Sequence, residues 1–372
     1  MSPFNSHWGA WGWLWRSSCC VAVAALTVPS TLASQVVVGQ VVDAPTAGPV
    51  GGGFVVLLDE QGKEVARTLT AADARFVLRA PRPGRYRLRS ERIGYVAFVA
   101  PAFTLEQDQT LTQQLPVTAL PVELAAIEIT GRTPCRMSPD RAEATAAVWG
   151  EIRKALAAAV WTASQPAYRY RAVGYRRAWD AARSRAVVET RDTLVGHWWA
   201  PWASRPAAEL AEHGYIRSEA DSTAYYGPDA RVIQDSTFLG SHCFTLTRRS
   251  LAGEEQVGLS FVPEPRRTLP DVRGALWLDQ RSAELRVLEY SYTRVPEGVE
   301  DERVGGTIEF LRLPSGAWIV RRWQIRMPRL GLDMFRAPDG HLERRVRVLG
   351  FQDAGGEVLE VRALDGKIVY PP

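Results

Sequence analysis

Alternation of apolar and charged residues between positions 36 and 115 is the feature that most constrains how this chain folds. Phe76 and Leu78, for example, should point to one face, and Arg75 and Arg79 to the other. Neighbouring side chains of a β-strand point to opposite faces, so the pattern predicts half-buried strands. Pro83-Gly84 combines a preset φ with tolerance of positive φ, as a tight turn between two strands requires. The segment is therefore predicted to form a small β-sandwich, and no catalytic group stands out in it.

Three parts of this segment carry a family resemblance: the strand Val38–Asp43, the turn and strand Pro83–Leu88, and the following Ile93–Tyr95. With these features it resembles the carboxypeptidase regulatory-like domain, a transthyretin-like β-sandwich. The resemblance implies a structural or recognition module, because in that family the domain accompanies a peptidase or an outer-membrane receptor without doing chemistry itself. The fold is also grouped with carbohydrate-binding sandwiches, an analogy at the level of the fold alone.

The first 33 residues predict export. Arg16 is followed by the apolar run Cys19–Val28, which is too short to span a bilayer as a helix. Pro29 ends the run, and small residues precede a predicted signal-peptidase cleavage site after Ala33. An uncleaved anchor is the alternative. We expect a protein of the periplasm, the outer-membrane surface or the exterior, with no transmembrane segment after cleavage.

Cleavage leaves Cys135 and Cys243 as the cysteines of the mature chain. In an oxidising compartment such a pair more often forms a structural bridge than two free thiols, so we predict a disulfide between them. In the chain-entropy model this bridge contributes about 4 to 5 kcal/mol. Two free thiols are the alternative, and a pair without clustered histidines does not form a zinc site.

Composition predicts a globular protein with two domains. The chain has 372 residues, of which 46% are hydrophobic and 23% charged, enough for two separate cores. Its formal charge of +4 is too small for a nucleic-acid-binding protein. We divide the chain into the signal (1–33), the sandwich (34–116), a linker with a short strand (117–137) and a second domain (138–372).

The second domain opens with a predicted helix. Ser138 is a suitable N-cap, and Pro139 is tolerated at the first helical position. The helix should end before Pro166. Its apolar stripe consists of Val148, Trp149, Ile152, Ala155, Leu156, Ala159 and Val160. Packing of this stripe on a sheet is favoured, and a helix lying on a membrane surface is the alternative.

From Tyr168 to Tyr370 the pattern predicts almost only β-strands. The predicted strands are residues 187–190, 243–246, 257–262, 274–278, 285–292, 306–313, 318–327, 346–351 and 358–364. Turn-forming residues at 279–282, 314–316, 353–356 and 365–366 separate later strands. Because hairpins follow one another, we expect an antiparallel sheet.

One short helix is predicted to interrupt these strands. Ser204 is its expected N-cap, Pro206 lies in its first turn, Leu210 faces inward and Gly214 ends it.

The predicted fold class is mainly β: an N-terminal transthyretin-like or immunoglobulin-like β-sandwich, an α-helix, and a larger antiparallel sheet that is curved or half-barrel in form. In the strand rhythm of residues 258–263, 274–279 and 285–290, the larger domain loosely resembles the lipoprotein-carrier (LolA-like) half-barrel of the bacterial envelope. That resemblance implies an apolar concavity for an acyl chain or a hydrophobic peptide. A sheet filled by its own side chains is the alternative.

The search for catalytic and metal-binding motifs is negative. The mature histidines are His197, His213, His242 and His341. They lack the spacing of a helical metal site, and no phosphate-binding loop, nucleophile elbow or dinucleotide fingerprint occurs. His242 and Cys243 are adjacent, but neighbours on a strand face opposite sides and do not form a base–nucleophile pair easily. We expect no catalytic residue, cofactor or metal, and favour a protein that is not an enzyme.

Aromatic residues are the best candidates for ligand recognition. The candidates are Trp198, Trp199, Trp202, Tyr225 and Tyr226. Exposed aromatic rings offer a platform for sugar rings or apolar chains. The alternative is that they plug an open end of the sheet.

These features favour an exported cell-envelope binding or interaction protein that holds an apolar (lipid) or glycan ligand and docks to an envelope protein or an outer-membrane partner. The rival is an envelope hydrolase, peptidase-like or glycosidase-like, whose site is dispersed over several strands.

Overall fold

The computed structural model describes residues 35–119, 139–182, 186–197, 204–219, 222–251, 253–296, 298–300, 303–336 and 341–371. Residues 34–372 form one compact unit. The predicted signal peptide, the short strand of the linker, Ser138, Cys135 and the three candidate tryptophans lie outside the described ranges.

The N-terminal domain is a β-sandwich. Its strands are β1 (Gln35–Asp43), β2 (Phe54–Leu58), β3 (Glu64–Leu69), β4 (Arg75–Ala80), β5 (Gly84–Glu91), β6 (Phe98–Val99), β7 (Phe103–Leu105) and β8 (Thr110–Val117). One sheet has the order β4-β1-β8, and the other β3-β2-β5-β6 with β7 also paired to β5. Phe76 and Leu78 are buried between exposed neighbours, which confirms the alternation read from the sequence.

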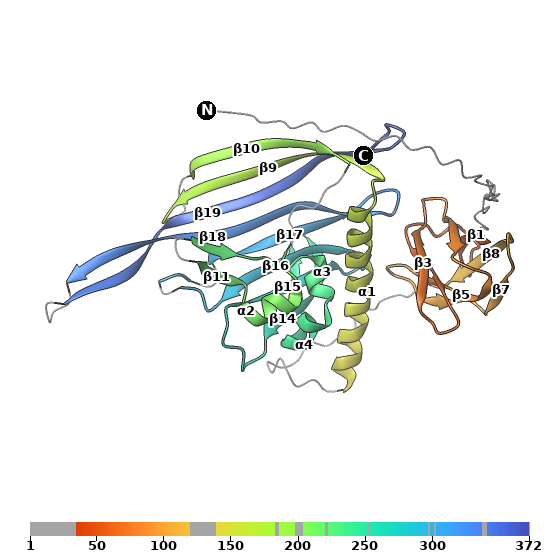
Figure 1. Ribbon diagram of the computed structural model, residues 1–372, viewed down its shortest axis with the longest axis horizontal. Coiled ribbons are helices and arrows are strands. Elements are labelled where there is room, and N and C mark those ends of the chain that lie inside the picture. The colour runs from red at the N-terminus through yellow and green to blue at the C-terminus, as the bar shows by residue number, and fades with distance from the viewer. Residues whose placement is uncertain are drawn as a thin grey trace, which may run out of the picture. The chain divides into compact units, whose positions relative to one another are not determined.

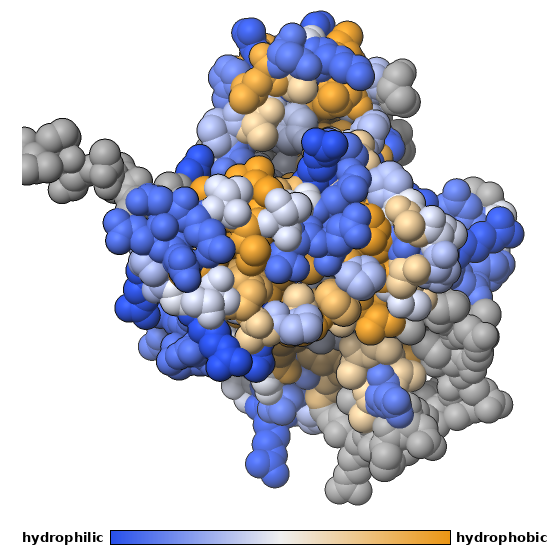
Figure 2. Space-filling model, turned by 90° about the vertical axis from the view of Figure 1, so that its right-hand side faces the viewer, coloured by the Kyte–Doolittle hydropathy of each residue, from blue (hydrophilic) through white to orange (hydrophobic). Residues whose placement is uncertain are grey.

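Hydrophobic residues on the face shown in Figure 2 lie among hydrophilic ones. Single exposed residues such as Val77, Val96 and Val99 are therefore ordinary features of a protein surface and require no partner.

The described residues from Pro139 onward form one long helix, three short helices, a two-stranded sheet and a large sheet (Figure 1). The elements up to the large sheet's meander are α1 (Pro139–Ser164), β9 (Tyr168–Asp180), β10 (Ala186–Gly196), α2 (Ala207–His213), β11 (Ile216–Glu219), β12 (Ser222–Tyr225), α3 (Ala230–Gln234) and α4 (Ser236–Ser241). The meander consists of β13 (His242–Leu251), β14 (Glu254–Pro263), β15 (Asp271–Asp279), β16 (Leu285–Thr293), β17 (Gly305–Arg312), β18 (Trp318–Arg336), β19 (Leu342–Ala363) and β20 (Ile368–Tyr370).

The ten-stranded sheet has the order β10-β9-β19-β18-β17-β16-β15-β14-β13, with β20 paired to β19. All its pairings are antiparallel, as the succession of hairpins predicted. The mainly β fold class is thereby confirmed.

The turn predicted at residues 353–356 is wrong. These residues lie in the middle of β19, so the two strands predicted on either side of them are one continuous strand. Asp353 is buried in that strand, and a Cβ at Gly355 would collide with the ring of Tyr175. The Asp and Gly residues that indicated a turn are present because an ion pair and a close ring contact need them.

The prediction of one short helix before the meander is also wrong. Two further helices follow α2, and Asp229 and Asp235 cap them through their side chains. Ser204 is not the N-cap of α2, because Pro206 occupies that position without a side-chain cap. Leu210 is fully buried and Gly214 ends the helix with a φ of 84°, both as predicted.

Helix α1 is a core helix. Val148, Ile152 and Leu156 are completely buried, and they belong to a cluster that includes residues of the large sheet. The helix ends at Ser164, ahead of Pro166 as predicted. Within the described ranges, no helix is long and apolar enough to cross a membrane. Packing on a sheet, the favoured interpretation of the apolar stripe, is confirmed.

Strand β2 of the sandwich packs against the same cluster. Val55 and Leu57 belong to the core of the sandwich, whereas Phe54 and Val56 belong to the cluster that contains α1. Phe54 meets Trp161 of α1 edge to face, with ring centroids 5.9 Å apart. All five residues of β2 are buried, because α1 covers the face that would otherwise meet solvent.

A charged pair on α1 adds polar contacts to this packing. The ammonium group of Lys154 donates to the carbonyl oxygens of Arg92 and Tyr95 at 2.9 and 3.0 Å, and it lies 2.7 Å from a carboxylate oxygen of Glu151. The other carboxylate oxygen of Glu151 accepts a hydrogen bond from the backbone N–H of Gly94 at 2.8 Å. The side chains of Lys154 and Glu151 are only 11% and 5% exposed, so the pair is largely shielded from water.

We expect Lys154→Met to lower the free energy of unfolding by about 3 kcal/mol, because it leaves the Glu151 carboxylate buried without its cation. Lys63→Met and Lys367→Met are matched controls, since these two lysines are exposed. Urea unfolding of the three variants checks the prediction. A loss of less than about 0.5 kcal/mol for Lys154→Met, the range of surface substitutions, would contradict it.

Candidate functional site

A hollow of about 640 Å³ opens on one face of the large sheet, over β14 to β18. Strand alternation places it on the face opposite α1. Leu276 of β15 and Leu288 of β16 belong to the buried cluster with the helix, whereas Ala275 and Glu289, one position along, line the hollow. The volume lies within the range of small-ligand pockets, about 300 to 1,000 Å³.

Small residues make the floor of the hollow. Ala275 of β15 contributes only a methyl group, and Gly305 and Gly306 begin β17, with β16 between these two strands. Gly305 has a φ of 154°, and a Cβ there would collide with the carbonyl oxygen of Tyr290 on the neighbouring strand. The close approach of the two backbones thus excludes a side chain at Gly305. The sheet surface is therefore lower here than at the neighbouring positions with longer side chains.

Polar side chains surround the floor. They are Ser260, Arg273, Glu289, Ser291, Arg303, Thr307, Gln324 and Arg326. Three of them are arginines and one is a glutamate, so the lining carries more positive than negative charge. The arrangement supplies hydroxyl, amide and guanidinium groups for a polar ligand.

A cluster around Glu289 holds one wall. Its Oε2 atom accepts hydrogen bonds from Arg249 Nη1 at 2.7 Å and from Trp277 Nε1 at 3.0 Å. The Arg249 guanidinium lies 4.0 Å from the centre of the Trp277 ring system, a cation–π contact. These contacts come from β13, β15 and β16 and limit the rotation of the Glu289 and Trp277 side chains.

Asp353 holds the opposite wall. It is 1% exposed and accepts two hydrogen bonds from the Arg326 guanidinium, at 2.7 and 2.8 Å. Its Oδ2 also accepts from Trp179 Nε1 at 2.9 Å. Bidentate pairing of this kind fixes the plane of an arginine. Arg303 is positioned by stacking on Phe351, with 4.5 Å between the guanidinium carbon and the ring centre.

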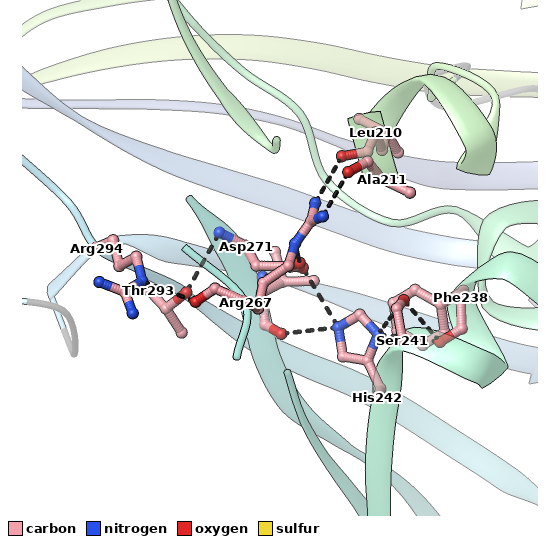
Figure 3. A network of polar contacts seen from close by, with 10 residues as sticks. Leu210, Ala211, Phe238, Ser241, His242, Arg267, Asp271, Thr293 and Arg294 are labelled. Carbon is pink, nitrogen blue, oxygen red and sulfur yellow. Dashed lines mark hydrogen bonds and ion pairs between the residues drawn. The ribbon is translucent and has the colours of Figure 1, made fainter. Parts of the chain in front are cut away.

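A second polar cluster joins α4 to the sheet (Figure 3). His242 Nδ1 lies 3.0 Å from the carbonyl oxygen of Phe238 and 3.2 Å from Ser241 Oγ. His242 Nε2 lies 3.2 Å from the carbonyl oxygen of Val272 and 3.3 Å from Asp271 Oδ1. The grouping contains the serine, histidine and aspartate types of a hydrolase triad.

Burial and hydrogen bonding indicate that this cluster is structural. The side chains of His242 and Asp271 are 1% and 2% exposed, and both ring nitrogens contact oxygen atoms of the protein. The Ser241 hydroxyl donates to the Phe238 carbonyl oxygen of its own helix. A general base must reach the substrate's proton, and this imidazole offers no open nitrogen to one.

Arg267 extends the cluster to α2. Its Nε donates to Asp271 Oδ2 at 2.7 Å, and its terminal nitrogens donate to the carbonyl oxygens of Leu210 and Ala211 (Figure 3). A cation at the last carbonyls of a helix is favourable. The cluster therefore connects α2, α4, β13 and β15.

The candidate tyrosines are placed, whereas the three candidate tryptophans lie outside the described residues. Tyr225 packs edge to face on the buried Tyr292, with ring centroids 5.4 Å apart. Burial raises the pKa of Tyr225 to about 12. Tyr226 lies under the guanidinium groups of Arg217 and Arg205, 5.1 and 5.8 Å from its ring centre. Neither tyrosine lines the hollow, and a role for either in ligand binding stays a prediction.

The predicted disulfide is not tested by the described residues. Cys243 is buried on β13, and Cys135 lies outside the described ranges. The bridge between them stays a prediction.

Sequence reasoning did not find the hollow. Gly274-Ala275 of β15 and Gly305-Gly306 of β17 were usable signals, because small residues on the two strands that flank β16 lower the sheet face on both sides of it. In the sequence, these glycines indicated only where the predicted strands 274–278 and 306–313 begin. The ion pairs that position its walls join residues 27 and 40 positions apart, and only the register of the strands brings them together.

Comparison with known proteins assigns the sandwich. The sequence profile of the carboxypeptidase regulatory-like domain matches residues 36–118. Those residues form a carboxypeptidase regulatory-like domain. This confirms the resemblance predicted for the first segment. The matched residues end next to Val117, the last residue of β8. A search of curated proteins returned no match.

Two solved structures share distant similarity. A minor pilin of the Gram-positive pathogen Streptococcus agalactiae is 17% identical over 28% of this chain and 49% of its own length, with a TM-score of 0.20. This chain therefore spans about half of that pilin. A putative membrane-associated protein of unknown function from Bacteroides fragilis is 12% identical over 87% of this chain and 97% of its own, with a TM-score of 0.17. Similarities this low carry no argument about the fold or the function of this chain.

We expect Asp271→Asn to destabilise the protein by about 3 kcal/mol, because Arg267 then loses its buried counter-ion. Asp192→Asn, on the exposed surface of β10, is the control. Thermal unfolding of both variants tests the structural role. An Asp271→Asn variant as stable as the control would contradict it.

Tyr225 should ionise with a pKa of about 12, above the ordinary value near 10. Because the folded state favours the neutral phenol, its contribution to stability is complete below pH 10 and is lost as the pH rises through 12. The difference in absorbance at 295 nm between the wild type and Tyr225→Phe, followed during an alkaline titration, isolates this group. Ionisation near pH 10 would mean that the ring is solvated and not packed.

Proposed function

We propose that this protein is an exported cell-envelope binding protein whose large sheet takes a glycan in the hollow over β14 to β18. The carrying observation is the hollow itself: a floor of small residues surrounded by hydroxyl, amide and charged side chains whose positions are held by ion pairs. Sugar hydroxyl groups are bound by such planar polar groups, and an acyl chain is not.

Packing on the other face of the sheet supports the choice of a polar ligand. The apolar side chains there are buried against α1, α3 and α4, including Leu259, Phe261 and Tyr292. A lipid or another apolar ligand would have to displace this core, at the cost of the burial that stabilises it. Of the two ligand classes that the sequence left open, the glycan is therefore the one we propose.

The proposal also includes the cellular location and the domain organisation of the chain. A cleaved signal at residues 1–33 would deliver it to the periplasm or the outer-membrane surface, and the sandwich predicted at 34–116 would act as an interaction module for an envelope partner. A linker at 117–137 and the domain 138–372 complete the proposed division, and a Cys135–Cys243 bridge would join the linker to that domain. The enzymatic rival, a hydrolase, has no group in the described residues that we would assign to it.

Filling the hollow should abolish binding. Thr307 is exposed at the rim on β17, so Thr307→Trp occupies the hollow with little cost to the fold. Thr193→Trp, at an exposed position of the edge strand β10, is the matched control. On an array of neutral and acidic oligosaccharides, we expect the wild type and the control to bind the same glycans, and Thr307→Trp to bind about tenfold or more weakly.

Three results would contradict the proposal: no glycan bound by the wild type, equal binding by both tryptophan variants, or binding of a fluorescent fatty acid in place of a glycan. Product analysis of the bound oligosaccharides separates binding from hydrolysis. Cleavage that Thr307→Trp abolishes would favour the hydrolase.

A further inference from the structure

Strands β18 and β19 continue beyond the rest of the sheet as a two-stranded arm, defined here as Pro328–Arg336 and Leu342–Gly350 (Figure 1). The pairing of β17 with β18 reaches Arg326, and the pairing of β9 with β19 reaches Gly350. Past these positions the described residues of the two strands pair only with each other. The arm therefore has two faces and two edges that no other described strand covers.

One face of the arm is apolar and exposed. Leu332, Met334 and Leu342 are 66%, 56% and 62% exposed. Leu332 pairs with Val346, and alternation places Met334 on the same face, so these side chains are neighbours across the hairpin. Such an apolar group on a projecting hairpin is a contact surface, because exposed strand pairs of soluble proteins otherwise carry polar residues there.

The opposite face carries an ion pair as well as the exposed Leu349, and the arm as a whole is cationic. Asp333 and Arg347 form an ion pair with 3.1 Å between Oδ2 and Nε. The sequence from Pro328 to Gly350 contains five arginines against three acidic residues. The arm thus combines a small apolar face with net positive charge.

We propose that the arm docks on the surface of an anionic lipid bilayer, with its apolar face inserted at the level of the headgroups. Apolar side chains beside cations are the combination that interfacial elements use, because burial of the former and attraction of the latter to anionic lipids add together. Arginines extend their apolar stems along such a surface while the guanidinium groups contact phosphate. The proposal does not depend on the glycan site.

The arm lies on the bilayer and does not cross it. Backbone groups on the outer edges of the hairpin have no partner strand among the described residues, and hydrocarbon would leave them without hydrogen bonds. The Asp333–Arg347 pair on the other face also requires water. Both constraints are met when only the apolar face enters the headgroup layer.

Lipid fits this surface better than a second copy of the chain. A stable dimer buries about 800 Å² on each partner, which three exposed apolar side chains do not supply. Two copies would also bring net positive arms together, whereas an anionic bilayer has the opposite charge.

Co-sedimentation with vesicles tests the proposal on the full chain, using vesicles of phosphatidylglycerol and phosphatidylcholine in equal parts and vesicles of phosphatidylcholine alone. The test variant is Leu332→Glu with Met334→Glu. The control is Leu251→Glu with Leu364→Glu, which places the same charges at positions 52% and 69% exposed outside the arm. All four leucine and methionine side chains are exposed, so thermal unfolding should be alike in both variants.

We expect the wild type and the control to bind the anionic vesicles, more weakly at high salt, and the test variant to lose binding by about tenfold. Failure of the wild type to bind, or equal binding by the test variant and the control, would overturn the proposal. So would a dimer of the wild type, seen by light scattering, that the test variant abolishes, because it would assign the arm to a second copy.

Discussion

The burial of α1 on two sides is the constraint on which the rest of this structure depends. One side of the helix packs on the large sheet, and another covers β2 of the sandwich, through contacts such as Phe54 with Trp161. A helix that packs against two sheets exposes little polar surface. This explains why the apolar residues of α1 extend beyond a single stripe. Strand β2 consequently contributes to two clusters, with Val55 and Leu57 in the core of the sandwich and Phe54 and Val56 in the cluster that contains α1.

This packing decides where a ligand can bind. Because the helices and their buried side chains occupy one face of the large sheet, that face offers no room for a bound molecule. The other face meets solvent, and its relief is set by residue size along each strand. The surface is low at Ala275 of β15 and at Gly305 of β17, with β16 between them, and the longer side chains around these positions form the rim. The packed core and the ligand site thus both result from the alternation of side chains between the two faces of the large sheet.

The extent to which this fold follows from sequence differs between local and distant interactions. Alternation predicted β4 and β14 because it depends on neighbours along one strand. The turn predicted at residues 353–356 was wrong, because aspartate and glycine also occur inside strands. Here the aspartate is buried in β19, and the glycines leave room for aromatic rings. Asp229 and Asp235 were available as capping signals for α3 and α4, but the helices are too short to show a periodic pattern.

The rim of the candidate site could not be predicted from the sequence, because its side chains are positioned by distant residues. A rim side chain is useful for recognition only if its orientation is fixed before the ligand arrives, since ordering it on binding costs entropy. Here the ordering comes from partners on other strands: Asp353 for Arg326, and Arg249 for Glu289. Each pair is joined by sheet register and not by sequence proximity, so no local motif marks it. The ion pairs between strands that orient the rim side chains for binding are therefore also the contacts that no local sequence motif indicates.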